Sequence, residues 1–511
     1  MPAGSLGGKS LLLTVSNWSA SLISMLTAIL VARRLGPEAL GAIGYGAGLV
    51  GLVMAALLPG FGQAHVKRLA EGQDAGRCLG TMLAAQAVVV AGLVPLAALA
   101  WALGAFASQS AIGPVFALLL AAQMATRLAD VYLAVFIARE WVVPHAAIQI
   151  GARLARLLAT VAVVVWVPDV TLIAATFVVD GVVATVVAAV VLGVRRGIRT
   201  RAPTRETIRA YWTYARPLLV TTPLALVQDS IDRVAVGWLG GLAAAGYYHI
   251  ARALWEALMS LLAAPALFLF TRLSALYARR DAGVVDEARR FFFSGLDKLL
   301  FVSVPVALLF WSLAEWLIRL LYGAAFVAAT PAVRILVVAT LVANVVNPYT
   351  HVLYARDEVA RFVPVNVLRI VVYGAVLVAL VAADGAGALP GAGEGATGAA
   401  VARLFLLAFP AWVYFRWTRE VADIGLYGRV WLYLGSFVGA AMLERAISTL
   451  LGMLGGPALG TTVVATVAAL VSYLGLVHAV HPGASANAAY AWSLISPANL
   501  WNSLRGTGRI R

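Results

Sequence analysis

Stretches of about 20 apolar residues, the length that crosses a bilayer as a helix, follow one another along almost the whole chain. Of its 511 residues, 62% are hydrophobic and 12% are charged, whereas roughly 25% are charged in a typical soluble domain. The polar segments between these stretches are too short for a separate soluble domain. We therefore expect an all-α polytopic membrane protein. The predicted spans, about fourteen, are 10–32, 38–60, 79–103, 112–137, 145–167, 170–193, 213–238, 243–270, 295–316, 330–354, 362–383, 397–417, 429–449 and 457–480.

Basic residues are distributed unequally between alternate loops of this map. With the N-terminus in the cytoplasm, 26 lysines and arginines fall on the cytoplasmic side and 4 on the other, as the positive-inside rule requires. This predicts a multi-pass protein of the plasma (cytoplasmic) membrane with both termini cytoplasmic. The net charge of +15 thus indicates contact with membrane lipids and not with nucleic acid.

Motifs for cofactors are weak or absent. A single cysteine and six scattered histidines do not predict a metal site. Residues 3–10, AGSLGGKS, resemble a nucleotide-binding loop but lack the preceding strand. We expect no cofactor and no nucleotide.

Two short segments predict an internal repeat, with chance similarity as the alternative because Leu-Gly and Gly-Ala are common in this composition. Residues 33–41, RRLGPEALG, follow the first predicted span, and residues 237–246, GWLGGLAAAG, follow the seventh, at an offset of about 204 residues. The basic segment 194–211 falls between the two halves. We expect a six-helix bundle with its basic cytoplasmic linker over 1–211, a second six-helix bundle over 212–420, and two further spans with an interfacial tail over 421–511.

Charged side chains inside the spans are the candidate functional residues. Each costs roughly 2.5–3.5 kcal/mol at the bilayer centre unless it faces a partner or water, so the eight arginines of the spans should face one another or water in a hydrated central cavity. Arg403 and Arg445 rank lower as substrate ligands, because their spans lie outside or at the edge of the likely cavity. Some have an acid one turn away on the same helix, and local ion pairs that only hold the bundle together remain an alternative for these. Arg153, Arg156, Arg369 and Arg403 have no such acid, which predicts a cationic cavity for an anionic substrate, since guanidinium groups bind phosphate through two hydrogen bonds.

Four groups of residues form short motifs near the ends of predicted spans. They are Leu35, Gly36, Pro37, Glu38 and Gly41; Asp232, Gly237, Leu239, Gly240, Gly246, Tyr248 and Ala251; Tyr322, Gly323 and Phe326; and Gly395, Gly398, Ala399 and Ala400. In order and spacing these motifs resemble those of the polysaccharide (O-antigen type) flippases of the multidrug/oligosaccharidyl-lipid/polysaccharide exporter superfamily, although Ile43 departs from the tyrosine that such proteins often carry. The resemblance implies two six-helix bundles in a V around a central cavity, alternating access, and export of undecaprenyl- or dolichyl-linked saccharides.

The resulting hypothesis is a flippase, not an enzyme, that moves a polyprenyl diphosphate-linked oligosaccharide from the inner to the outer leaflet. The predicted substrate-binding residues are Arg127, Arg153, Arg156, Arg252 and Arg369. The candidates for proton or sodium coupling are Asp229, Asp232 and Glu256. The alternatives are a cation-coupled drug exporter of the same superfamily, which should favour acids in its cavity, and a membrane glycosyltransferase, which normally needs a large loop with catalytic acids.

Two segments outside the spans are expected to lie at the membrane surface. The loop 271–294 combines four arginines with the run Phe291, Phe292 and Phe293, a pattern typical of a short helix on an anionic leaflet, with a solvated loop as the alternative. The tail from residue 484 carries Trp492 and Trp501, which favour the interface.

Overall fold

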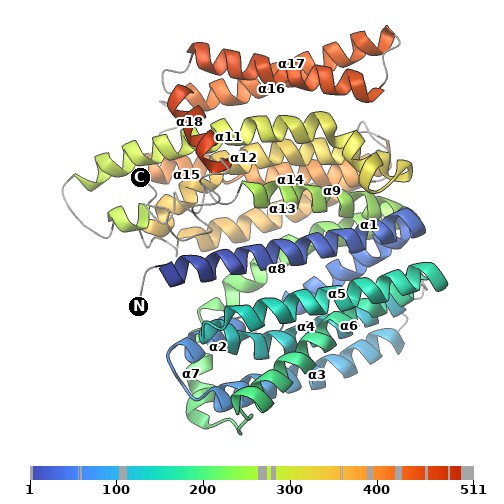
Figure 1. The fold of residues 1–511 in the computed structure, drawn as a ribbon, viewed down its shortest axis with the longest axis vertical. Helices are drawn as coiled ribbons and strands as arrows, with labels where there is room; N and C mark the ends of the chain where they lie inside the picture. The colour runs from blue at the N-terminus through green and yellow to red at the C-terminus, as the bar shows by residue number, and fades with distance from the viewer. Residues whose placement is uncertain are drawn as a thin grey trace. The chain divides into compact units, whose positions relative to one another are not determined.

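A computed structural model of the chain contains helices and no strand in the residues that it describes (Figure 1). These residues are 4–55, 57, 60–102, 112–262, 273–277, 283–356, 358, 361–387, 395–419, 428–454, 458–480 and 484–495. The helices are α1 (Gly4–Ala55), α2 (Phe61–Ala70), α3 (Ala75–Ala102), α4 (Ile112–Ala138), α5 (Val142–Trp166), α6 (Val170–Val190), α7 (Arg205–Ala215), α8 (Leu218–Ala235), α9 (Gly241–Leu261), α11 (Val284–Leu321), α12 (Thr330–Ala355), α13 (Phe362–Gly385), α14 (Ala396–Ala408), α15 (Ala411–Thr418), α16 (Gly428–Met453), α17 (Ala458–Val480) and α18 (Ala484–Ile495). Short π-helical segments, η1 (Val191–Arg195) and η2 (Val236–Gly240), follow α6 and α8, and a 3-10 helix, η3 (Ala324–Ala329), precedes α12.

Eleven helical stretches within these ranges are long and apolar enough to cross a membrane. The prediction of an all-α polytopic protein is therefore confirmed, whereas the count of fourteen stays a prediction. Two predicted spans, 10–32 and 38–60, share the single stretch Val15–Ala55. Two others, 213–238 and 243–270, correspond to α8 and α9, which are not among the eleven.

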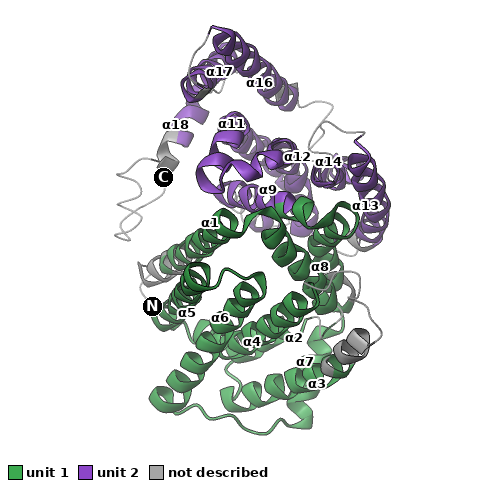
Figure 2. Ribbon diagram, turned by 90° about the vertical axis from the view of Figure 1, so that its right-hand side faces the viewer, with its two compact units in different colours: residues 1–246, 502–511 green, residues 247–501 purple. Residues whose placement is uncertain are grey.

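The described residues form two compact units that divide between Gly246 and Tyr247 (Figure 2). Unit 1 contains α1 to α8 with the first turns of α9, and its closest helix packing is between α4 and α6. Unit 2 contains the rest of α9 and α11 to α18, in which α12 packs against α11 and α14, and α16 pairs with α17. The predicted functional boundaries after residues 211 and 420 stay predictions.

The two copies of the sequence repeat adopt the same backbone turn in unit 1. Gly36 breaks α1 with φ 82° and ψ −172°, and Pro37 starts the second segment of the helix. Gly241, where η2 meets α9, has φ 86° and ψ 177°. Because L-residues rarely adopt this φ, glycine is required at both positions, and proline suits the first helical position after the turn. The structure thus supports the predicted repeat at the level of backbone geometry.

Five residues after each turn, a second glycine packs on the other copy of the repeat. A Cβ atom added to Gly41 would lie 1.7 Å from the carbonyl oxygen of Leu242, and one added to Gly246 would lie 2.1 Å from the carbonyl oxygen of Pro37. The two contacts are reciprocal, as a local two-fold axis requires. Glycine is needed here for close approach of two backbones rather than for an unusual dihedral angle.

A buried histidine joins three helices of unit 1. His65 on α2 is 2% exposed, and its Nε2 lies 3.0 Å from the carbonyl oxygen of Val131 on α4. Since a carbonyl can only accept, Nε2 carries the hydrogen, and the neutral ring accepts at Nδ1 from the hydroxyl of Tyr211 on α7, 2.7 Å away. Burial lowers the pKa of His65, with the bond to Val131 opposing the shift, so the folded protein favours the neutral ring.

The segment 284–294 is the first part of the 38-residue helix α11. Phe292 is fully buried, and its ring lies 5.1 Å from that of Tyr349 on α12. The expectation of a short helix lying on the membrane surface is therefore wrong for this segment. An aromatic run beside arginines does not distinguish a lipid-facing side from one packed on a neighbouring helix.

Helix α18 packs on α11 through a buried polar contact. Asn487 is 4% exposed and donates from Nδ2 to Oδ2 of Asp297, 2.9 Å away. Lys298 lies over the ring of Tyr490 at 5.4 Å. The first part of the predicted interfacial tail is thus held by unit 2, whereas residues 496–511, with Trp501, lie outside the described residues.

Candidate functional site

Three of the predicted arginines lie in a polar seam between α4, α5 and α6 of unit 1. Arg153 forms a salt bridge across helices, from Nη1 to Oδ2 of Asp180. The premise that Arg153 is uncompensated is therefore wrong, because the acid stands on the next helix and not one turn away on its own. Arg153 is therefore one partner of an ion pair that joins α5 and α6, as well as a candidate substrate ligand.

Arg156 is also engaged within the seam. It is 9% exposed, and its guanidinium carbon lies 3.5 Å from the centre of the Phe177 ring on α6. This is a close cation–π contact, in which the ring face attracts the guanidinium electrostatically but offers it no hydrogen-bond acceptor. The Nε atom of Arg156 is buried and without a hydrogen-bond partner, so the group keeps capacity to donate.

Arg127 on α4 has Asp130 one turn away, so a local ion pair was the alternative to a role in substrate binding. No ion pair between them is found within 4.0 Å, although the two groups are close enough to interact electrostatically. The buried Nε of Arg127 has no hydrogen-bond partner. Among the three arginines of unit 1, Arg127 and Arg156 therefore fit an incoming anion better than Arg153.

In unit 2, Arg252 and Glu256 on α9 form a local ion pair, which was the alternative to a substrate role for arginines with an acid one turn away. The Nε and Nη2 atoms of Arg252 lie 3.1 and 2.7 Å from Oε1 of Glu256. The side chain of Arg252 is 3% exposed, whereas that of Glu256 is 51% exposed. The pair thus has a buried cation and an accessible anion, and an incoming anionic group would compete with Glu256 for the guanidinium.

Two more arginines, on other helices, belong to the same group: one lies at Trp255, and the other is near the first. Arg403 on α14 is 5% exposed, and its guanidinium carbon lies 5.2 Å from the centre of the Trp255 ring on α9. The guanidinium carbon of Arg252 lies 5.4 Å from the same ring. Arg369 on α13 is within electrostatic range of Arg403 and of the Tyr414 hydroxyl. We call Arg252, Trp255, Arg369 and Arg403 the unit 2 cluster.

The remaining acids predicted for ion coupling lie on α8 in unit 1. Asp232 is fully buried, and its Oδ1 accepts from the backbone N–H of Arg233 at 2.8 Å. The side chain of Asp229 is 54% exposed and approaches Nη2 of Arg233 only to 4.0 Å. The two carboxylates therefore differ in exposure, and Asp229 is the more accessible of the two.

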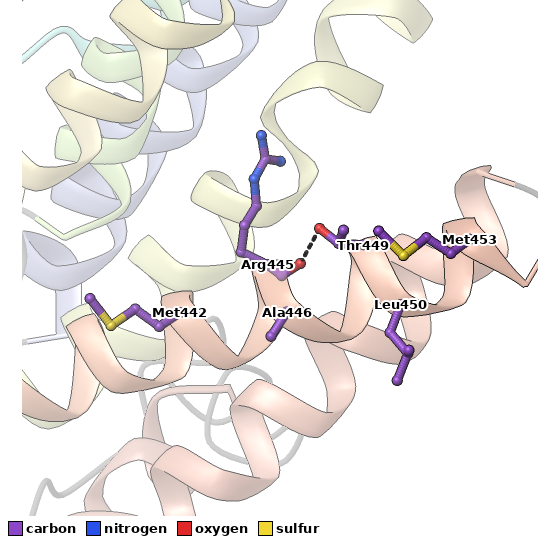
Figure 3. Close-up of a pocket in the computed structure, with 6 residues that line it drawn as sticks. All are labelled: Met442, Arg445, Ala446, Thr449, Leu450 and Met453. Atoms are coloured by element: carbon purple, nitrogen blue, oxygen red, sulfur yellow. Dashed lines mark hydrogen bonds between the residues drawn. The ribbon is translucent and has the colours of Figure 1, made fainter.

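A shallow groove of about 510 Å³ runs along one face of α16 (Figure 3). Its charged residue is Arg445, whose side chain points away from Leu450, and the Thr449 hydroxyl bonds to the carbonyl oxygen of Arg445 at 2.8 Å. The rest of the lining is apolar and contains Met442, Ala446, Leu450 and Met453. Such a face suits lipid tails more than a charged headgroup, in keeping with the low rank of Arg445 as a substrate ligand.

Sequence reasoning ranked Arg403 low and did not select Trp255. Both were missed for the same reason, since positions 255 and 403 meet only in the folded chain. One signal was present: Arg252 and Trp255 are three residues apart on one helix, a spacing at which cation and ring share a face.

The fold is similar to those of several solved transporters. The lipid II flippase MurJ, in an inward closed conformation, aligns with a TM-score of 0.67 at 11% identity over 91% of this chain and 98% of that one. A multidrug resistance MATE family transporter of the MOP superfamily, in an inward-facing conformation, gives 0.58 at 17% identity over 78% and 94%. A MOP superfamily transporter from Pyrococcus furiosus gives 0.53 at 16% identity over 81% and 94%. The fold is thus that of MOP superfamily transporters.

The sequence itself identifies the family. Residues 6–276 match the model of the polysaccharide biosynthesis protein family, and the chain belongs to that family. A comparison with curated protein sequences gives no significant match. The resemblance to a polysaccharide family is confirmed, and the fold is one that solved transporters of the MOP superfamily share.

Proposed function

We propose that this protein is a flippase for a lipid-linked saccharide that carries a diphosphate. Its family and fold support a flippase or exporter, and the observation that carries the choice of substrate is the unit 2 cluster. Three guanidinium groups from α9, α13 and α14 gather there, of which Arg252 and Arg403 are buried and Arg369 is partly exposed. Such a cluster favours an anionic guest, and diphosphate matches the paired donors of guanidinium.

In this proposal the predicted arginines of each unit bind the anionic part of the substrate. These are Arg252 and Arg369 in unit 2, and Arg127, Arg153 and Arg156 in unit 1. The polyprenyl chain stays in lipid, because burying an apolar chain in a charged site would gain nothing. An exporter of organic cations, the second candidate, would place acids where this chain places arginines.

Arg252→Ala and Arg369→Ala test the binding role. We expect both variants to insert normally and to lose most of the translocation of a lipid-linked oligosaccharide in proteoliposomes, measured as protection from an external glycan-cleaving reagent. Arg319→Ala is a matched control, because Arg319 makes the same two bonds to an acid one turn away, at 3.1 and 2.9 Å from Glu315, on an exposed site. Normal translocation by the first two variants would refute the role of these arginines.

Coupling to protons or sodium is proposed for Glu256, with Asp229 and Asp232 as further candidates. A proton or cation on Glu256 weakens its hold on Arg252 and frees that guanidinium for the substrate; release of the cation restores the pair and displaces the substrate. Glu256→Gln imitates the protonated state. We expect this variant to bind substrate but to translocate it at a rate that no longer responds to an ion gradient.

The outcomes of this experiment separate the acids. A gradient response retained in Glu256→Gln and lost in Asp229→Asn or Asp232→Asn would assign coupling to α8. Wild-type translocation that ignores both proton and sodium gradients would remove coupling altogether. Export of small organic cations without any lipid-linked substrate would favour the drug-exporter alternative.

A further inference from the structure

Trp255 carries a polar group for which the described part of the chain supplies no partner. The residue is 9% exposed, and its indole Nε1 is buried and makes no hydrogen bond to any described residue. Buried N–H groups in native proteins are almost always hydrogen-bonded, and an exception calls for an explanation. A tryptophan needed only for packing could be replaced by phenylalanine without this unsatisfied donor.

The neighbours of Trp255 are themselves donors. The guanidinium carbons of Arg252 and Arg403 lie 5.4 and 5.2 Å from the centre of its ring. Arginine and the indole N–H can only donate hydrogen bonds. The group that completes such a site must therefore bring acceptor oxygens, and the two neighbouring cations select a negatively charged one.

Glu256, the residue that follows Trp255 in the chain, is the exposed partner of the buried Arg252. Its carboxylate is half exposed and accepts a hydrogen bond from Arg252. A ligand oxygen that displaces this carboxylate from Arg252 lies near the tryptophan, because the guanidinium carbon of Arg252 is 5.4 Å from the centre of its ring.

We infer that the indole N–H of Trp255, with Arg252 and Arg403, forms a subsite for one phosphate group of a polyprenyl diphosphate. The inference rests on the proposed function and adds two residues to it. Trp255 donates one hydrogen bond to a phosphate oxygen, and Arg403 supplies a charge from α14. The subsite recognises the diphosphate itself and not the attached sugar.

Farnesyl diphosphate, a short polyprenyl diphosphate, is a suitable probe for the purified full-length protein. Trp255→Phe keeps an aromatic ring between the arginines and removes only the N–H donor, and Trp255→Tyr serves if the phenylalanine variant folds poorly. We expect affinity for farnesyl diphosphate to fall about tenfold, the effect of losing a hydrogen bond to a charged group. Arg403→Gln should also weaken binding. Trp412→Phe, at a ring that is 71% exposed in the same unit, should leave it unchanged.

A spectroscopic readout separates a ligand contact from a packing effect. In protein labelled with ¹⁵N-tryptophan, the indole N–H resonance that disappears in Trp255→Phe should shift downfield with farnesyl diphosphate and not with farnesol. Unchanged affinity in Trp255→Phe together with an unmoved resonance would overturn the subsite while leaving the proposed function standing. A wild-type protein that fails to bind farnesyl diphosphate would overturn both.

Discussion

Substituting alanine for Gly246 tests the backbone contact between the two copies of the repeat. The new Cβ would lie 2.1 Å from the carbonyl oxygen of Pro37, whereas carbon and oxygen atoms in close contact are about 3.3–3.6 Å apart. The two chains must separate by roughly 1.2 Å, the difference between these distances. The obstacle is backbone, so no side chain can rotate away.

The expected loss of stability follows from two opposing effects. Overpacking costs about 3 kcal/mol at the upper end of its usual range, and alanine gains about 1 kcal/mol over glycine inside a helix. The net loss is therefore about 2 kcal/mol. Gly41→Ala should behave in the same way, because its Cβ would lie 1.7 Å from the carbonyl oxygen of Leu242. The double variant should lose less than the sum, since one separation relieves both clashes.

Cys78 provides the assay. It is the single cysteine of the chain and is fully buried on α3 of unit 1, so a thiol-reactive dye reports unfolding of that unit. We expect Gly246→Ala to melt several degrees below the wild type. Gly151→Ala is the matched control, since Gly151 lies inside α5 of the same unit with nothing within 4 Å of an added Cβ, and it should melt slightly higher. Equal melting temperatures for Gly246→Ala and Gly151→Ala would refute the contact.

Three further predictions concern polar contacts. Because the pKa of His65 is lowered by burial, the unfolded chain takes up a proton near pH 6.5 before the folded one does, and the melting temperature should fall as the pH drops below about 6.5. This pH dependence should weaken in His65→Gln, and an equally steep fall in that variant would contradict the assignment. Arg153→Gln leaves Asp180 without its salt bridge and should lower the free energy of unfolding by up to about 3 kcal/mol. Adding Asp180→Asn should largely restore the melting temperature, and a double variant as unstable as the single one would argue against the pair. Asn487→Leu removes the bond to Asp297 and should raise hydrogen exchange throughout α18, and unchanged protection there would show that the helix is held by its apolar contacts alone.

The sequence was sufficient to predict features set by local rules. Apolar length and loop charge predicted the helices, and the glycines of the repeat marked two turns that the backbone angles of Gly36 and Gly241 support. Spacing of three or four residues also found the pair Arg252 and Glu256. Each of these depends on neighbours along one helix.

Contacts across helices could not be read in this way. Asp180 stands 27 residues beyond Arg153, and no helical period connects them. Arg403 reaches Trp255 from α14, so its charge was judged without its neighbour. The length of α11 was also missed, because its first turns look like an exposed basic segment until Phe292 is seen against Tyr349.

The glycine contact of the repeat joins main chain to main chain. Gly41 and Gly246 bring no side chain to it, and each meets a peptide carbonyl of the other copy. Interlocked side chains resist sliding because they must change rotamer together, whereas a glycine surface has no rotamers to change. A small rotation of the two helix starts against each other therefore requires no change of side-chain rotamer at this contact. We expect the contact to hold the two backbones close together and still to permit such a rotation.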